Sequence, residues 1–252
     1  RDFCLSRGLG DVYKRQDSPN IGAIHSFSFH NYVTLFTTPE LIDMIIGSIA
    51  LAIGSAVLAT ILGTTGAIGA FYSKKNVNGT MSVLNQIPVV NADVVTGFSL
   101  CILLVVVFGV SKNTYIPLVI GHTVLSAPFV YLAVVPKLKQ MDPSLYEAAL
   151  DLGATPGYTL IHIIIPQIAS GIISGFVMAV TLSLDDYFVA TYTKPATFDT
   201  ISTYVVNATK GSQTNIRTAL WALSTIIFLI VVIVEVVMNF APIKNEAQKE
   251  KH

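Results

Sequence analysis

The chain has 252 residues, of which 52% are hydrophobic and 12% are charged, and its formal net charge is +0. Soluble domains carry about 25% charged residues, so this composition indicates a protein whose solvent is lipid. The balanced charge offers nothing to attract nucleic acid, and the two cysteines, Cys4 and Cys101, provide neither a disulfide framework nor a metal-ligand spacing.

The N-terminal residues 1–16 differ from the rest of the chain. They contain four basic residues but no apolar stretch long enough for a signal-peptide core or a membrane helix. We expect this stretch to be a foreign segment that replaces a native first span; a genuine short tail is the alternative. Residues 17–40 carry no Lys or Arg, and we expect them to lie on the extracytoplasmic side.

Long apolar runs then recur, and a run of roughly 20 residues is enough to cross the hydrocarbon core. Each must be helical, because lipid offers the backbone no hydrogen-bond partner. The first begins at Thr38-Pro39-Glu40, a capping residue followed by a proline that suits the first helical position. Its Gly and Ala residues, spaced four apart, predict close packing inside a bundle. The five predicted spans are Leu41–Tyr72, Val89–Val110, Tyr115–Val135, Ile168–Tyr192 and Ile216–Phe240.

Lys and Arg residues between the spans predict the orientation, because positive residues stay on the cytoplasmic side. This places residues 73–88, the loop 136–167 and the tail 241–252 in the cytoplasm. The basic residues on the predicted cytoplasmic side are Lys74, Lys75, Lys137, Lys139, Lys244, Lys249 and Lys251. Those on the predicted extracytoplasmic side are Lys112, Lys194, Lys210 and Arg217.

The loop 136–167 contains two predicted short helices. Asp142 can cap the first, Pro143 suits its first position and Gly153 can end it in the left-handed conformation. Thr155-Pro156 then offers a second start. The first helix is amphipathic and too short to be stable alone, so it needs a groove to pack into. Its apolar stripe consists of Leu145, Ala148, Ala149 and Leu152.

The same loop resembles the EAA loop of binding-protein-dependent ABC permeases, written E-A-A-x3-G-x9-I-x-L-P, with Ile165 in place of Leu. The matching residues are Glu147, Ala148, Ala149, Gly153, Ile163 and Pro166. The resemblance implies an all-α, polytopic type I ABC importer transmembrane domain over residues 41–240, with five spans retained of an expected six. It also implies that the loop docks on an ATPase subunit, whereas a plain surface helix-turn-helix is the alternative.

Within that family the chain is similar to the spermidine/putrescine permeases, on the segments Ser26–Tyr32, Pro88, Asp93–Gly97 and Ser183–Tyr187. The resemblance implies a polyamine importer in the bacterial cell membrane, with an ABC ATPase dimer, a second permease subunit and an extracytoplasmic substrate-binding protein as partners. Permeases for ferric iron or thiamine share the loop and remain alternatives.

Four residues are expected on the substrate pathway. A carboxylate at membrane depth costs about 2.5–3.5 kcal/mol, so Asp185 and Asp186 need partners, water or a function. An acidic outer rim would suit a polycation, and Tyr187 could add cation–π contacts. The alternative is that the two aspartates mark a helix end or cap a following helix. Asp93, expected near a cytoplasmic entrance, lines the exit route or caps its helix.

No catalytic or metal-binding constellation is predicted. The chain lacks a G-x-x-x-x-G-K-[ST] phosphate loop, so ATP and Mg are expected on a separate ATPase chain, with no cofactor here. His122 and His162 have no ligand neighbours at metal spacing and are interpreted as packing residues. A secondary transporter or channel is the rival of another class, which paired broken helices in inverted repeats would favour; a membrane enzyme is a weaker rival.

Overall fold

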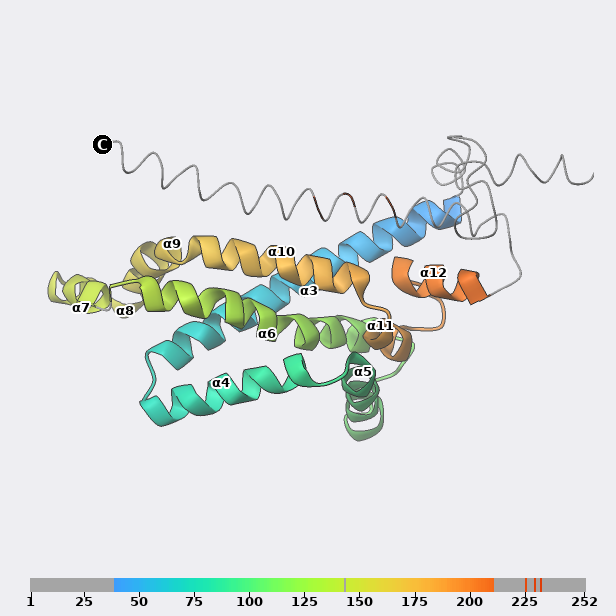
Figure 1. Ribbon diagram of the computed structural model, residues 1–252, viewed down its shortest axis with the longest axis horizontal. Coiled ribbons are helices and arrows are strands. Elements are labelled where there is room, and N and C mark those ends of the chain that lie inside the picture. Colours follow the sequence, from blue (N-terminus) through green and yellow to red (C-terminus); the bar gives the residue numbers. More distant parts are fainter. Residues whose placement is uncertain (1–38, 143, 211–224, 226–228, 230–231, 233–252) are drawn as a thin grey trace, which may run out of the picture. The chain divides into compact units, whose positions relative to one another are not determined.

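The computed structural model describes residues 39–142, 144–210, 225, 229 and 232 (Figure 1). The regular elements in this part of the chain are all helical, which confirms the predicted all-α class. The predicted fifth span, the tail 241–252 and residues 1–16 lie outside the described residues. The helices are α3 (Pro39–Phe71), α4 (Lys75–Val90), α5 (Asp93–Ile102), η1 (Leu103–Val107), α6 (Ile116–Gln140), α7 (Ser144–Asp151), α8 (Pro156–Thr159), η2 (Leu160–Ile164), α9 (Ile165–Gln167), α10 (Ala169–Asp185), α11 (Phe188–Thr193) and α12 (Ile201–Lys210).

The chain forms two compact units, one made of residues up to Ala50 together with those from Ala196 onward, the other of Leu51–Pro195. In the first unit, the start of α12 is tied to the first turns of α3. The backbone N–H of Ile201 donates to Ser48 Oγ at 2.9 Å. The ring of Phe198 lies over Gly47, where an added Cβ would be 2.7 Å from the ring.

Helix α6 is the centre of the second unit and packs along α10 (Figure 1). Val130 of α6 is fully buried. A Cβ added at Gly63 of α3 would lie 2.7 Å from Val130 Cβ, and one added at Gly175 of α10 would lie 3.1 Å from Val130 Cα. Both neighbouring helices therefore approach α6 through a glycine, as small-residue packing in membranes requires.

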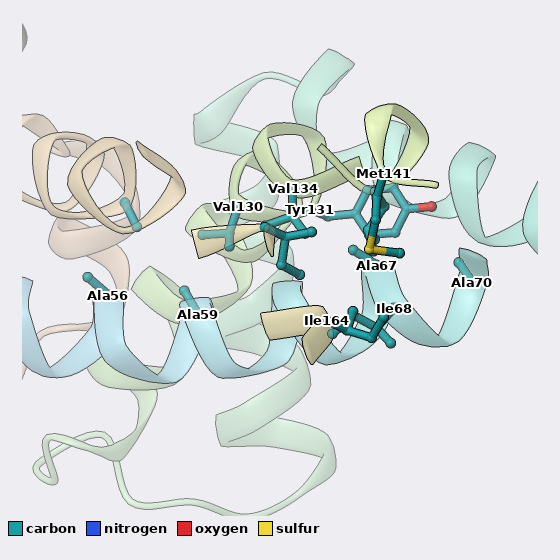
Figure 2. Packing of buried hydrophobic residues seen from close by; sticks show 13 residues of the cluster. Ala56, Ala59, Ala67, Ile68, Ala70, Val130, Tyr131, Val134, Met141 and Ile164 are labelled. Atoms are coloured by element: carbon teal, nitrogen blue, oxygen red, sulfur yellow. The ribbon is translucent and has the colours of Figure 1, made fainter. Parts of the chain in front are cut away.

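A continuous apolar core follows from this packing. Figure 2 shows Ala56, Ala59 and Ala67 of α3 facing Val130, Val134 and Tyr131 of α6. Ile164 and Met141, from the segment between α6 and α10, belong to the same cluster. Within the described residues, α3 buries an alanine-rich face and exposes a face of large residues that includes Ile53, Leu58, Ile61 and Leu62.

The two ends of α6 carry different structures. Helices α7 and α8 lie at the end where α6 terminates, and α5 and α11 lie at the end where it begins (Figure 1). With 25 residues, α6 is about 38 Å long, enough to span a hydrocarbon core. The segment 136–167 and the α5–α11 region therefore lie at opposite ends of the unit.

Two of the predicted spans are broken, which corrects the sequence prediction of continuous helices. Helix α4, Lys75–Val90, contains most of the predicted cytoplasmic segment 73–88 and the first two residues of the predicted second span, and the chain bends by 106° between α4 and α5. Asn91 and Ala92 are extended there, which ends one helix and starts another. The predicted fourth span is likewise interrupted, because Asp186 is extended between α10 and α11.

Helices α3 and α6 are each long and apolar enough to cross a membrane. Among the described residues there are up to four candidate spans if each bent pair, α4 with α5–η1 and α8–α9 with α10, counts as one. Hydropathy alone does not reveal these breaks, since it is averaged over a window and the few polar residues at each break are outweighed by apolar neighbours.

We expect Gly63→Ala to destabilise the packing of α3 on α6, because its Cβ would meet Val130 at 2.7 Å. Gly54→Ala on the same helix is the matched control, since nothing lies within 4 Å of its added Cβ. Overpacking costs about 1–3 kcal/mol. Thermal unfolding in detergent should therefore place Gly63→Ala below Gly54→Ala; equal midpoints would contradict the close approach.

Candidate functional site

Helix α7 starts where the sequence predicts it, with Asp142 as its cap. Asp142 Oδ1 accepts hydrogen bonds from the backbone N–H of Ser144 at 2.9 Å and from its hydroxyl at 2.7 Å. These two bonds, the backbone one foremost, lower the pKa of the Asp142 carboxyl. Pro143, the predicted first helical residue, lies outside the described residues, and α7 runs from Ser144 to Asp151.

The end of α7 is a Schellman motif. Gly153 has φ +88°, the left-handed conformation predicted from the sequence. The N–H of Gly153 donates to the Leu150 carbonyl at 2.9 Å, and that of Ala154 donates to the Ala149 carbonyl at 3.1 Å. Thr155 then caps α8 by accepting a bond from Tyr158 N–H at 3.4 Å, which confirms the second predicted helix start.

The motif residues of this loop divide between inner and outer faces. Ala149 is 6% exposed, and Ile163 packs against the apolar core. The remaining motif residues are exposed: Glu147, Ala148, Gly153 and Pro166. The last residue of the predicted stripe, Leu152, is 89% exposed and does not share the buried face of Ala149. The loop is thus anchored on one side and presents an apolar residue on the other.

An aromatic contact joins this loop to the first described span. The rings of Tyr72, which follows α3, and Tyr146 of α7 have centroids 4.9 Å apart. Tyr146 also packs against the apolar core. Helix α7 is therefore in direct contact with the end of α3.

A cavity of about 280 Å³ lies at the other end of α6. Its volume is near the lower end for small-molecule sites, which run from about 300 Å³ upward. All four predicted pathway residues line it. The full lining is Asp93, Leu125, Phe129, Leu182, Asp185, Asp186, Tyr187 and Phe188.

The two adjacent aspartates in this cavity have different surroundings. Asp186 is 8% exposed, and its carboxylate accepts bonds from the N–H groups of Val189 at 3.2 Å and Ala190 at 2.7 Å. It therefore caps α11. Asp185 is exposed. Asp186 thus has the position of a helix cap, which was one interpretation of the pair. Asp185 has the position of a carboxylate open to a substrate, which was the other.

Asp93 lies in the same cavity as Asp185, which corrects its expected position near the opposite entrance. The physical reason is that α4, most of which was predicted as a cytoplasmic segment, carries the chain along α6 to this end before α5 begins at Asp93. Asp93 is exposed in the first turn of α5, where a carboxylate is also stabilised by the helix dipole.

Sequence reasoning missed a buried polar network beside the cavity. His122, interpreted as a packing residue, has its Nδ1 3.0 Å from Ser183 Oγ and its Nε2 3.8 Å from Asp186 Oδ2. An ionisable side chain inside an apolar span was the available signal. Ser183 is 5% exposed, so this Ser–His–Asp set is too enclosed to act as a nucleophilic triad.

Broken apolar helices, with an exposed loop at one end and an acidic cavity nearer the other, are features expected of the membrane-spanning subunit of a transporter. The model of the family described as "Binding-protein-dependent transport system inner membrane component" matches residues 63–241. The chain belongs to this family, which confirms the resemblance seen in the loop and decides against a secondary transporter or channel. It is a multi-pass membrane protein.

Relatives with known roles are similar over most of the chain. The spermidine/putrescine transport system permease protein PotC of Haemophilus influenzae is 30% identical over 223 residues, which cover 87% of this chain and 83% of the relative. The putrescine transport system permease protein PotI of Escherichia coli strain K12 is 30% identical over 187 residues, covering 72% and 66% respectively. PotC of the same strain is 28% identical over 206 residues, covering 80% and 76%.

Solved structures share the fold. A bacterial alginate ABC transporter in complex with its alginate-bound periplasmic protein aligns with a TM-score of 0.65 at 18% identity, covering 93% of this chain and 87% of the other. An amino acid ABC transporter aligns with a TM-score of 0.59 at 16% identity, covering 86% and 98%. These neighbours confirm the type I importer fold predicted from the loop.

We expect Asp142→Ala to fray the start of α7, because it removes both bonds to Ser144. Hydrogen exchange by mass spectrometry should show faster exchange in residues 144–148 of the variant than of the parent. Since the pKa of Asp142 is lowered in the folded state, its stabilisation is present at neutral pH and disappears as the pH falls through that lowered value. The difference between variant and parent should vanish there, whereas Asp151→Ala should leave the same amides unchanged.

Proposed function

We propose that this chain is a permease subunit of a polyamine importer, with spermidine or putrescine as substrate, in the bacterial cell membrane. The single observation that carries the substrate class is the cavity in which Asp93, Asp185 and Asp186 meet. A cavity rich in carboxylates favours cations and excludes anions. The PotC and PotI relatives carry substrates of this chemistry according to their names.

Within the cavity, Asp185 is the proposed ligand for a substrate ammonium group. It is exposed, and its partner Asp186 is already engaged in capping α11. Asp93 would bind a second ammonium group of the same substrate. Tyr187 and Phe188 also line the cavity, and their rings can contribute cation–π contacts of about 0.5–2 kcal/mol.

The loop from Asp142 to Pro166 is the proposed docking site for an ABC ATPase dimer. Its anchored residues, Ala149 and Ile163, fix it to the bundle, and Glu147, Ala148, Gly153 and Leu152 face outward. Leu152, which directly follows α7, is 89% exposed and would fill a pocket of the partner. The contact between Tyr146 and Tyr72 would then pass movement of the ATPase to α3.

The remaining partners follow from the family description, which names a binding-protein-dependent system. A second permease subunit would complete the pore, and an extracytoplasmic substrate-binding protein would deliver the polyamine. ATP and Mg would be bound by the ATPase subunits, since this chain has no phosphate loop.

We expect Asp185→Asn to reduce spermidine uptake by the reconstituted importer. A hydrogen bond to a charged group contributes about 1.5–3 kcal/mol, so the loss should be on the order of tenfold or more in apparent affinity. Asp43→Asn is the control, because Asp43 is an exposed carboxylate that does not line the cavity. Equal uptake by Asp185→Asn and the parent would remove Asp185 from the substrate path. Uptake of ferric iron or thiamine in place of spermidine would assign the importer to another solute.

We expect Leu152→Ala to weaken ATPase docking, because burying a leucine contributes about 1.5–3 kcal/mol. The amount of ATPase retained on the purified permease should fall roughly tenfold, together with ATP-driven uptake. Leu62→Ala is the matched control: Leu62 is 58% exposed, but on α3 rather than on the loop. Gly153→Pro should uncouple hydrolysis from uptake by disturbing the end of α7, and unchanged substrate-stimulated transport in that variant would refute the coupling role.

A further inference from the structure

Four buried polar side chains form a connected series across the second unit. Ser55 Oγ of α3 lies 3.2 Å from Ser183 Oγ of α10, and Ser183 Oγ lies 3.0 Å from His122 Nδ1 of α6. His122 Nε2 faces Asp186 Oδ2 at 3.8 Å. Their exposures are 0% for Ser55 and His122, 5% for Ser183 and 8% for Asp186.

Hydrogen bonds join the side chains of three helices in this series. Ser183 Oγ lies within hydrogen-bond distance of both His122 Nδ1 and Ser55 Oγ, and the tautomer of His122 decides which group donates. His122 Nε2 has no hydrogen-bond partner among the described residues and lies 3.8 Å from Asp186 Oδ2, so it contacts the carboxylate without a hydrogen bond. The network thus links α3, α10 and α6 directly beside Asp186.

Asp186 is where this network meets the helix break. Its carboxylate accepts hydrogen bonds from two N–H groups in the first turn of α11, those of Val189 and Ala190. Val189 in turn fits between two glycines: a Cβ added at Gly97 would lie 2.9 Å from Val189 Cα, and one added at Gly121 would lie 2.8 Å from Val189 Cγ1. The position of Asp186 therefore fixes α11 against α5 and α6.

Capping of α11 by Asp186 does not by itself require the buried side chains of Ser55, Ser183 and His122. The two bonds to backbone N–H groups would end α10 and start α11 without a buried histidine in the second turn of α6. Burying polar side chains is costly unless they are paired, so the network is better explained by the unique geometry that it imposes. The side chain that this geometry orients is that of Asp185, which is exposed. Successive side chains of a helix point about 100° apart, so fixing Asp186 also fixes the direction of Asp185.

We propose that His122 and Ser183 are positioning residues that hold the break between α10 and α11 and thereby direct Asp185 into the acidic cavity. They touch no substrate themselves. The consequence for uptake rests on the function proposed above, whereas the positioning itself is measurable without a polyamine.

The test uses the assembled importer in which Cys4→Ala and Cys101→Ala remove the native thiols and Asp185→Cys introduces a reporter. The rate of modification by a small, membrane-impermeant methanethiosulfonate reagent is measured in the nucleotide-free state. His122→Ala removes the group that holds Ser183, which releases the end of α10 and lets residue 185 leave the cavity for the surrounding solvent more often. This variant should therefore label about fivefold faster than the parent, the change expected when about one hydrogen bond is removed. Ser183→Ala should do the same.

Ser126→Ala is the matched control. Ser126 is fully buried on α6, one turn from His122, and its hydroxyl has no hydrogen-bond partner among the described residues. It should label at the parent rate. The double variant His122→Ala/Ser183→Ala should label no faster than either single variant, because both act through one network. If His122→Ala does not assemble, Ser183→Ala, which removes a single oxygen atom, decides alone.

Parent-like labelling of His122→Ala and Ser183→Ala would overturn the proposal, as would a double variant whose acceleration is the product of the two. In the background that retains Asp185, His122→Ala should also lower spermidine uptake severalfold while Ser126→Ala does not. Accelerated labelling together with no spermidine uptake by the parent would refute the substrate and leave the positioning intact. Normal spermidine uptake by the parent, together with parent-like labelling of His122→Ala and Ser183→Ala, would refute the positioning and leave the substrate intact.

Discussion

The structure of the second unit depends on one packing interaction, that of Val130 with glycines on two other helices. Gly63 and Gly175 let α3 and α10 approach α6 at the same level, and a side chain at either position would collide with Val130. In lipid, apolar surfaces gain little by meeting each other, so close approach of small residues must supply the attraction between helices. The rest of the unit is arranged around the helix that this interaction fixes.

Because α6 is held on two sides, its length separates two regions of different chemistry. The end near Gln140 leads into the loop with the exposed Leu152, and the end near Ile116 lies beside the cavity with Asp185 (Figure 1). A rigid helix that both regions touch is a physical route by which one can affect the other. The ring contact of Tyr146 with Tyr72 adds α3 as a second such element.

Sequence reasoning succeeded where the signal is local. The cap of α7 by Asp142 and its end at Gly153 depend on neighbouring residues, and the structure confirms them. The predicted cap of the first span, Thr38, lies outside the described residues. Sequence reasoning failed at the bends next to Asn91 and Asp186, because hydropathy is summed over a window and an apolar segment scores alike whether straight or broken. His122 was misjudged for another reason: its partner Ser183 lies 61 residues away, and no spacing rule connects them.

The π-helical turn η2 has a consequence for the spacing of the loop motif. It lies within the nine-residue interval between Gly153 and Ile163 and runs on to Ile164, and a π-turn holds more residues than an α-helical turn. Removing one residue from this turn would let it relax to an α-helical turn, and the residues on either side would keep the faces that they present. Ile164, which is fully buried, would then stay in the core although the interval was one residue shorter. The same deletion in α10, a regular α-helix, would rotate the residues that follow by about 100°. The π-turn therefore lets the length of this interval vary by one residue without turning the loop relative to α10.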